Sequence, residues 1–324
     1  MTEVLQTPKL ITVFGGSGFL GRHVVRALAK RGYRIRVACR RPDLAGYLQP
    51  LGNVGQIQPV QANLRVRWSV DRAAQESDHV VNLVAILFEG GKQSFDAVHD
   101  FGARAVAEAA RSVGAGLTHI SSIGADKDSE SDYARTKALG EAAVFDTIPD
   151  AVVMRPSIMF GPDDAFFNRF ANMARFSPVL PLIGGGRTRY QPVFAGDVAE
   201  AIARSVDGDV AGGKVYEFGG PQELTFRQCM ETMLEAIDRK RLLLNVPWWA
   251  AEIQGALLGM LPNPLLTSDQ VKLLRVDNVV SDSAIKEGRT LEGLGVTQTS
   301  LSAVLPSYLW RFRPAGQFTR GNEA

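Results

Sequence analysis

A serine, a tyrosine and a lysine are spaced so that they could act together on a carbonyl group. Ser122 follows a short apolar segment, and Tyr133 and Lys137 lie four positions apart on one face of a predicted helix. A phenol has an ordinary pKa of about 10, and a neighbouring ammonium favours its ionised form. We interpret these three as candidate catalytic residues, with Tyr133 as the acid/base. Ser121 stays open as an alternative to Ser122, because adjacent strand residues point to opposite faces.

A glycine-rich turn precedes this set. Gly15, Gly18 and Gly21 are spaced G-x-x-G-x-x-G at the point where an apolar segment gives way to helical spacing. The first glycine permits a tight turn, the second lets a pyrophosphate approach the backbone, and the third lets the helix pack against the strand. Backbone amides and the positive end of the helix dipole then face the phosphates. We therefore predict a bound dinucleotide and these candidate cofactor-binding residues: Gly15, Gly16, Ser17, Gly18, Phe19, Leu20 and Gly21.

Two arginines, Arg40 and Arg41, directly follow the next predicted strand. Proteins that prefer NAD usually carry an acidic residue here, which binds the ribose hydroxyls. Guanidinium groups instead match a 2′-phosphate, so the sequence favours NADP(H) over NAD(H). The alternative is that both arginines extend a solvated basic surface. Asn63 follows the third predicted strand, where it could contact the adenine or cap a turn.

The elements that position these residues alternate along the chain. Strands are predicted at 9–14, 34–39, 57–60, 80–87, 117–121 and 151–154, and helices at 19–31, 101–113 and 133–145. This alternation indicates a parallel sheet covered on both faces. We predict an α/β fold with a Rossmann-type doubly wound parallel sheet, which forms a dinucleotide-binding domain at 1–155. A smaller C-terminal α/β lobe for a substrate or partner is predicted at 156–324, with helices at 197–206 and 225–237.

Composition limits the function classes. The chain has 324 residues, with 36 Lys and Arg against 34 Asp and Glu, and its formal net charge of +2 argues against nucleic acid as a partner. Two cysteines and four scattered histidines indicate neither a disulfide framework nor a metal site. No apolar segment reaches the ~20 residues needed to span a bilayer. Residues 1–8 resemble neither a secretory signal nor a transit peptide, so we expect a cytoplasmic protein.

These motifs together resemble the short-chain dehydrogenase/reductase superfamily in its extended branch, over nearly the whole chain. Two further stretches carry the resemblance: 155–162, which reads RPSIMFGP, and 191–199, which reads QPVFAGDVA. In that family the first follows the strand beside the nicotinamide, and the second begins a helix near the substrate cleft. The resemblance implies that five residues belong to the cofactor site: Val84, Ala85, Tyr133, Lys137 and Pro156. Taken alone, Arg155 would be an ion-pair partner and Asp197 a residue at a helix N-terminus.

Within this branch the chain is most similar to the family of NAD(P)H-binding accessory subunits of respiratory complex I, in a bacterial form. The stretch from Ser122 to Tyr133 is short, and residues 166–178 and 246–280 also carry this resemblance. It implies that NADP(H) is a structural ligand. It also implies that the C-terminal lobe docks on complex I subunits at a membrane-proximal face, peripheral to the inner face of the cytoplasmic membrane. The open alternative is an NADPH-dependent oxidoreductase or epimerase acting on a small molecule, such as a nucleotide sugar or a hydroxysteroid-like substrate.

Two positions leave further alternatives open. His99 stands where many active members of the branch have Asn, which weakens the expected proton relay; it is either a substitute hydrogen-bonding group or a core histidine. Trp248 and Trp249 begin an apolar helical stretch at 248–261 and point in different directions. We predict that one fills the core of the lobe and that the other is available to a partner or a lipid interface. The alternative is that both are core residues.

Overall fold

The computed structural model describes residues 8–262, 264–314 and 316. The chain forms two compact units whose segments alternate along the sequence. The first unit contains the described residues up to Ser121, then Arg135–Met154 and Ala199–Tyr216. The second contains Ser122–Ala134, Arg155–Val198 and the described residues from Glu217 onward. Residues 1–7, which carry most of the expectation about targeting signals, lie outside the described part.

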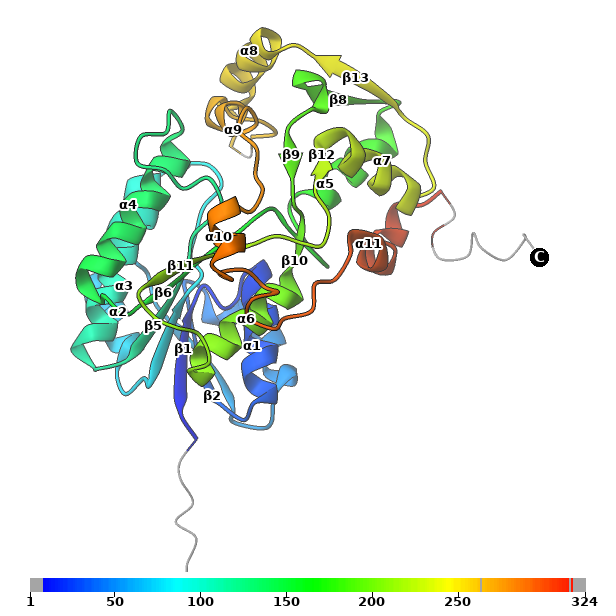
Figure 1. Cartoon of the computed structure of the whole chain (residues 1–324). Coiled ribbons are helices and arrows are strands. Elements are labelled where there is room, and N and C mark those ends of the chain that lie inside the picture. Colours follow the sequence, from blue (N-terminus) through cyan, green and yellow to red (C-terminus); the bar gives the residue numbers. More distant parts are fainter. Residues whose placement is uncertain (1–7, 263, 315, 317–324) are drawn as a thin grey trace, which may run out of the picture. The chain divides into compact units, whose positions relative to one another are not determined.

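A seven-stranded sheet runs through the first unit (Figure 1). Its order is β11-β6-β5-β4-β1-β2-β3, and all neighbouring strands from β3 to β6 are parallel. The strands are β1 (Leu10–Phe14), β2 (Arg34–Cys39), β3 (Ile57–Gln61), β4 (His79–Asn82), β5 (Gly116–Ile120), β6 (Val152–Pro156) and β11 (Lys214–Phe218). Because β1 lies between β2 and β4, the strand order reverses beside it, as in doubly wound folds. The predicted fold class is confirmed.

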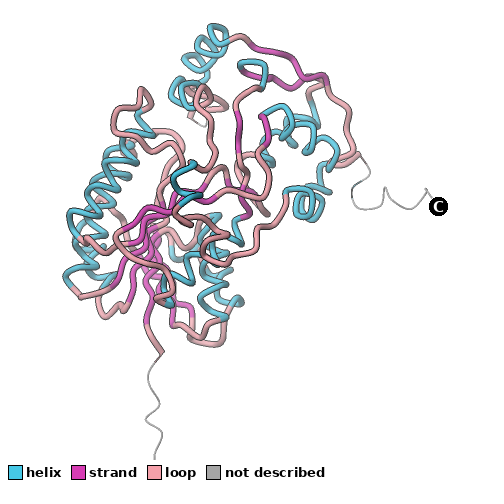
Figure 2. Tube along the Cα trace, viewed as in Figure 1, coloured by secondary structure: helices cyan, strands magenta, loops and turns pink. Residues whose placement is uncertain are grey.

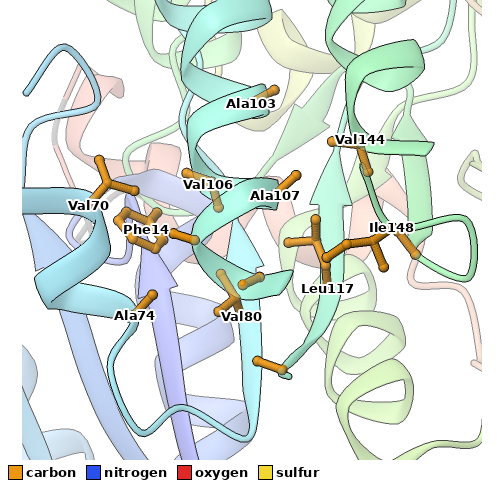
Figure 3. Close-up of a cluster of buried hydrophobic side chains, with 14 of the residues drawn as sticks. Phe14, Val70, Ala74, Val80, Ala103, Val106, Ala107, Leu117, Val144 and Ile148 are labelled. Carbon is orange, nitrogen blue, oxygen red and sulfur yellow. The ribbon is translucent and has the colours of Figure 1, made fainter. Parts of the chain in front are cut away.

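Helices cover both faces of this sheet, with α2, α3 and α4 on one face and α1 and α6 on the other (Figure 1). Their bounds are α1 (Phe19–Lys30), α2 (Arg67–Ala74), α3 (Phe101–Ser112), α4 (Asp132–Thr147) and α6 (Ala195–Asp207). Figure 3 shows the core under α2, α3 and α4, where strand residues Phe14, Val80 and Leu117 meet helix residues Val70, Val106 and Val144. The apolar spacing of the helices therefore buries one face of each against the strands.

Short strands and long loops make up much of the second unit (Figure 2). Three pairs of strands occur here: β7 (Met159–Phe160) with β10 (Val193–Phe194), β9 (Arg189–Tyr190) with β12 (Leu224–Thr225), and β8 (Val179–Ile183) with β13 (Leu242–Val246). The helices are α5 (Phe167–Phe176), α7 (Phe226–Ala236), α8 (Trp248–Leu258), α9 (Ser268–Leu273), α10 (Asp282–Lys286) and α11 (Leu301–Leu309). None of the described helices combines the length and the apolar character needed to cross a bilayer.

A buried polar contact ties the last helix of the second unit to α5. The hydroxyl of Tyr308 in α11 donates a hydrogen bond to Asp164, which is 2% exposed. The same carboxylate accepts a hydrogen bond from the Phe167 amide at 2.6 Å and so caps the start of α5. Burial raises the pKa of both partners, Asp164 and Tyr308.

The structure differs from the sequence-based expectation at two strands. β4 ends at Asn82 rather than at residue 87, because the Asn82 side chain accepts a hydrogen bond from the Val84 amide at 3.2 Å and the chain leaves the sheet there. β11 lies in the stretch expected to form the C-terminal lobe, yet it is the edge strand of the main sheet. Helix α2 was not expected from the sequence.

Candidate functional site

The candidate cofactor residues of the first unit follow successive strands at one edge of the sheet. Gly15 follows β1, Arg40 follows β2, Asn63 follows β3, Val84 follows β4 and Ser121 follows β5. Because these strands are parallel, their carboxyl ends lie at the same edge. Ligands of open α/β sheets bind outside this edge, where the strand order reverses.

The glycine-rich turn has the geometry of a phosphate-binding loop. Gly15 has a φ of +79°, which few residues other than glycine adopt, and its amide donates to the Ala38 carbonyl at 3.0 Å. A Cβ on Gly21 would lie 2.4 Å from the Gly16 carbonyl oxygen, so only glycine lets α1 begin this close to the turn. Helix α1 has Gly18 as its N-cap residue, and glycine has no side chain that could cap the first turn. Its amides can therefore donate to an anion, and the residues fit a dinucleotide.

A hollow of about 460 Å³ lies beside this turn. Its lining residues are Ser17, Arg40, Arg41, Leu44 and Tyr47. The Tyr47 hydroxyl donates to the Ser17 carbonyl at 2.6 Å, and the Arg22 guanidinium lies 5.4 Å from the centre of the Tyr47 ring. Tyr47 thus attaches the loop after β2 to the glycine turn. Sequence analysis missed it, because nothing in the local pattern indicates this contact.

Both arginines of the hollow already have partners. Arg40 donates to the Gln93 side chain at 2.7 Å. Arg41 forms a two-point ion pair with Asp43, at 3.0 and 2.7 Å, and this hydrogen bonding lowers the pKa of the Asp43 carboxyl. A 2′-phosphate would compete with Asp43 for Arg41. The expectation that no carboxylate competes for these arginines is therefore wrong, because Asp43 follows Arg41 by two residues and pairs with it.

Three further candidate cofactor residues are Asn63, Val84 and Ala85. The Asn63 side chain accepts a hydrogen bond from the Arg65 amide at 3.2 Å, so it caps a turn, which is one of the two roles left open. Val84 lies beside Gly15, since a Cβ on that glycine would be 3.2 Å from the Val84 side chain. Ala85 is exposed. The end of β4 therefore flanks the glycine turn.

Lys137 is the most deeply buried cation of the candidate set. It is 1% exposed, and its ammonium donates to the Ile120 carbonyl at the end of β5 at 2.7 Å. Burial lowers the pKa of Lys137 to about 8, although the negative charge of Glu141 acts to raise it. The ammonium is therefore held at the edge of the sheet where a ligand would bind.

Two buried histidines near Lys137 are neutral. The Nε2 of His99 accepts a hydrogen bond from the Ile86 amide at 3.1 Å, so its proton is on Nδ1, which lies 3.1 Å from the Thr136 hydroxyl. Burial and then the charge of Lys137 lower the pKa of His99 to about 3. The same two causes hold the pKa of His119 well below its usual value. His99 is thus a satisfied core histidine. The role of His119 was not predicted from the sequence.

Tyr133 and Ser122 are neighbours within the second unit. Burial raises the pKa of the Tyr133 phenol, and the Ser122 hydroxyl opposes this by favouring the ionised form. Of the two candidate serines, Ser122 is the one whose hydroxyl acts on the phenol pKa. Asp269, which sequence analysis did not single out, adds a negative charge that raises the phenol pKa further. Spacing in α4 places Tyr133 and Lys137 on one helix face, as predicted.

Asn278 fixes the stretch after Pro156 in the second unit. The Ser157 hydroxyl donates to the Asn278 side chain at 2.7 Å, and the Asn278 amide group donates to the Ile123 carbonyl at 3.1 Å. The Pro156 carbonyl accepts a hydrogen bond from the Ile123 amide at 3.1 Å. These bonds hold the segment that begins at Ser122. Sequence analysis placed Asn278 only in a stretch of resemblance.

Arg155 and Asp197 have structural contacts in the second unit. Arg155 lies 3.7 Å from Glu217, as expected for an ion-pair partner. Asp197 stands in the first turn of α6 and accepts two hydrogen bonds from Thr299, at 2.7 and 2.9 Å.

The two tryptophans of α8 face different surroundings within the second unit. Trp248 packs on Gly184, where a Cβ would come within 2.2 Å of the indole, and the Arg275 guanidinium lies 5.3 Å from its ring. Trp249 is 67% exposed, and three apolar residues at helical spacing from it are exposed as well: Ile253, Leu257 and Met260. Trp248 is half-buried against the core cluster that contains Ala251 and Val271, and Trp249 is exposed, so the two tryptophans face different surroundings, as expected. That Trp249 meets a partner stays a prediction.

A family model described as NAD dependent epimerase/dehydratase family matches residues 11–219. The chain belongs to this family, which is an extended branch of the short-chain dehydrogenases/reductases, and the resemblance inferred from the motifs is confirmed. The NADPH-dependent quinone oxidoreductase of Escherichia coli, solved with NADPH, has the same fold: the TM-score is 0.71 at 18% identity, covering 92% of this chain and 99% of that one.

Two relatives indicate different roles. A protein of Arabidopsis thaliana named NADH dehydrogenase (ubiquinone) 1 alpha subcomplex subunit 9, mitochondrial, is 32% identical over 318 residues, which cover 94% of this chain and 78% of the relative. The ceramide reductase of Caulobacter vibrioides is 36% identical over 174 residues, which cover 54% of each chain. The narrower resemblance to complex I subunits is thus confirmed over nearly the whole chain.

We expect the stability of the nucleotide-free protein to rise with pH because of Lys137. Its pKa is about 8 when folded and 10.5 in an unperturbed chain, so between these values the unfolded chain binds more protons. From pH 7 to 10, the free energy of unfolding should rise by about 2 to 3 kcal/mol relative to that of Lys137→Met. Denaturant titrations at each pH measure this difference. Lys30→Met, which changes an exposed lysine, is the control. The same pH dependence of the free energy of unfolding in Lys30→Met and Lys137→Met would contradict a lowered pKa for Lys137.

Proposed function

We propose that this protein is an NADP(H)-binding accessory subunit of respiratory NADH:quinone oxidoreductase (complex I), with the dinucleotide as a structural ligand. The observation that carries the proposal is the match to a named subunit of that enzyme over 94% of the chain. The glycine turn and the hollow beside it support binding of a dinucleotide. A ligand at 100 times its dissociation constant adds about 2.7 kcal/mol to stability without any chemistry, which suits a structural role.

NADP(H) rather than NAD(H) is the ligand that the hollow favours. Arg40 and Arg41 line it, and both are exposed and able to exchange their present partners for a phosphate. Charge-assisted hydrogen bonds to a phosphate are roughly twice as strong as neutral ones. The nearby Asp43 reduces this preference, because it already neutralises Arg41.

We predict that the nucleotide-free protein binds NADPH about tenfold or more tightly than NADH, and that changing Arg40 and Arg41 to Ala removes the difference. Asp43→Asn should strengthen NADPH binding. Calorimetric titration of each variant with both nucleotides measures this. Arg34→Ala, at the opposite end of β2, is the matched control. Equal or tighter NADH binding that the double substitution leaves unchanged would rule out the cofactor assignment.

The exposed face of α8 is the surface that we propose meets the complex. Two apolar residues of β13, Leu242 and Leu244, are also exposed, at 64% and 53%. Three arginines precede or flank this strand: Arg175, Arg239 and Arg241. Burial lowers the pKa of Arg239, and the charges of Arg241 and Arg175 lower it further. Apolar side chains beside a cationic cluster suit a membrane-proximal location, where anionic head groups border the complex. This supports peripheral association at the membrane.

We predict that the tagged protein, purified in mild detergent, brings down subunits of NADH:quinone oxidoreductase, and that Trp249→Ala abolishes this without changing the thermal stability of the free protein. Trp68→Ala is the matched control, since Trp68 is 66% exposed, but in α2 of the first unit. Trp248→Ala should instead destabilise the protein by about 3 kcal/mol or more, as a large-to-small core substitution does. Retention of the subunits by Trp249→Ala would exclude α8 as the docking surface.

A second candidate function is an NADPH-dependent oxidoreductase or epimerase. The observation that favours it is the placement of Ser122 beside the Tyr133 phenol, together with the relative named as a ceramide reductase. In such an enzyme a bound nucleotide would be the source of the hydride for a carbonyl carbon. Tyr133 would donate the proton to the carbonyl oxygen, and Ser122 would orient that oxygen.

Tyr133→Phe separates the two functions. The change removes only the hydroxyl, so an accessory subunit should keep its nucleotide affinity within about threefold and still assemble with its companions. An enzyme should lose turnover by several orders of magnitude. Nucleotide titration, co-purification and NADPH oxidation with a panel of carbonyl compounds measure the three properties. Oxidation of NADPH by a defined carbonyl substrate, lost in Tyr133→Phe, would favour the enzyme instead.

A further inference from the structure

The start of helix α4, which carries Tyr133, receives its cap from a distant segment. The carboxylate of Asp269 in α9 accepts three hydrogen bonds: from the Asp132 amide at 2.7 Å, from the Tyr133 amide at 3.2 Å and from the Ser131 hydroxyl at 2.9 Å. The Ser131 oxygen accepts in turn from the Ala134 amide at 3.3 Å. The backbone amides of the first three residues of α4 thus each have a hydrogen-bond acceptor. The helix itself provides no backbone acceptor for these amides.

A second contact joins the same two segments. The ammonium of Lys272, three residues after Asp269, donates to the Glu130 carbonyl at 3.0 Å. Asp269 and Lys272 both belong to the short helix α9. Together they hold the residues before α4 and the first turn of α4 in place. The carboxylate also lies at the positive end of the α4 dipole, where a negative charge is favoured.

Helix α9 is itself firmly placed within the second unit. Thr267 and Gln270 form a capping box at its start, with Gln270 donating its amide to the Thr267 hydroxyl at 3.1 Å. Val271 is 1% exposed in a core cluster that also contains Ala251 of α8. A Cβ on Gly255 of α8 would lie 3.0 Å from the Ser268 amide nitrogen, so α8 and α9 are in close contact. Asp269 thus projects from a helix that its cap and its packing on α8 hold in place.

We propose that Asp269 is the positioning residue for Tyr133: by capping α4 from α9, it fixes the backbone from which the phenol projects. The negative charge of the same carboxylate adds to burial in raising the pKa of the Tyr133 phenol. The inference rests on the second candidate function, and only for the importance of Tyr133. Its test uses the purified, nucleotide-free protein and needs neither a companion subunit nor turnover, so the two can fail separately.

The experiment compares Asp269→Ala and Asp269→Asn by hydrogen exchange and by titration of the phenol. In Asp269→Ala, exchange at the amides of residues 132 and 133 should accelerate by about tenfold or more, beyond any change in global stability. In Asp269→Asn, which keeps a neutral acceptor, the acceleration should be smaller. Asp282→Ala, which removes an exposed first-turn carboxylate from α10, is the control and should leave these amides unchanged.

Titration of the phenol distinguishes positioning from a purely structural role. The Tyr133 absorbance is obtained as the difference between each protein and the same protein with Tyr133→Phe. Both Asp269 variants should lower the phenol pKa, because the nearby negative charge is gone. Unchanged exchange at residues 132 and 133 in Asp269→Ala would overturn the proposal. So would a phenol titration that is the same with and without the carboxylate.

Discussion

The buried ammonium of Lys137 is the constraint on which the candidate site of the first unit depends. A cation removed from water needs neutral surroundings and at least one strong acceptor. The Ile120 carbonyl supplies the acceptor, and His99 and His119 stay neutral because burial and the ammonium both oppose their protonation. The hydrogen bonds of the two histidines are those of neutral imidazole rings. The Asn82 amide group, whose oxygen accepts from Val84, faces the Nδ1 of His119 as a donor.

The second unit has an apolar core of its own, and polar side chains add contacts between segments that are far apart in the chain. Asn278 bonds to Ser157 across 121 positions, Tyr308 to Asp164 across 144, and Asp269 to Ser131 across 138. Each contact closes a loop that the short strands of this unit would leave unsupported. A buried donor or acceptor left without its partner costs about 1 to 3 kcal/mol. These few residues therefore determine the loop conformations more than the local sequence does.

Local patterns explain which features could be predicted from the sequence. The strands β1, β2 and β3 and the glycine turn were predicted closely, because apolar runs and glycine spacing act over a few residues. The arginines after β2 were found for the same reason. The Asp43 pairing was missed although it lies two residues from Arg41, because only the cation was considered. Tyr47, Asn278 and Asp269 could not be found, since their roles depend on tertiary contacts that a single sequence does not encode locally.

The alternation of the two units along the chain has a consequence for biosynthesis. The first unit lacks its last two segments when Ser121 has been made, and it becomes complete only at Tyr216. At about 5 to 20 residues per second, the intervening stretch of about 95 residues takes roughly 5 to 20 s to translate. Until β6 emerges, β5 is an unpaired edge, and until β11 emerges, β6 is one. The nascent chain therefore exposes strand edges of the kind that chaperones protect from aggregation.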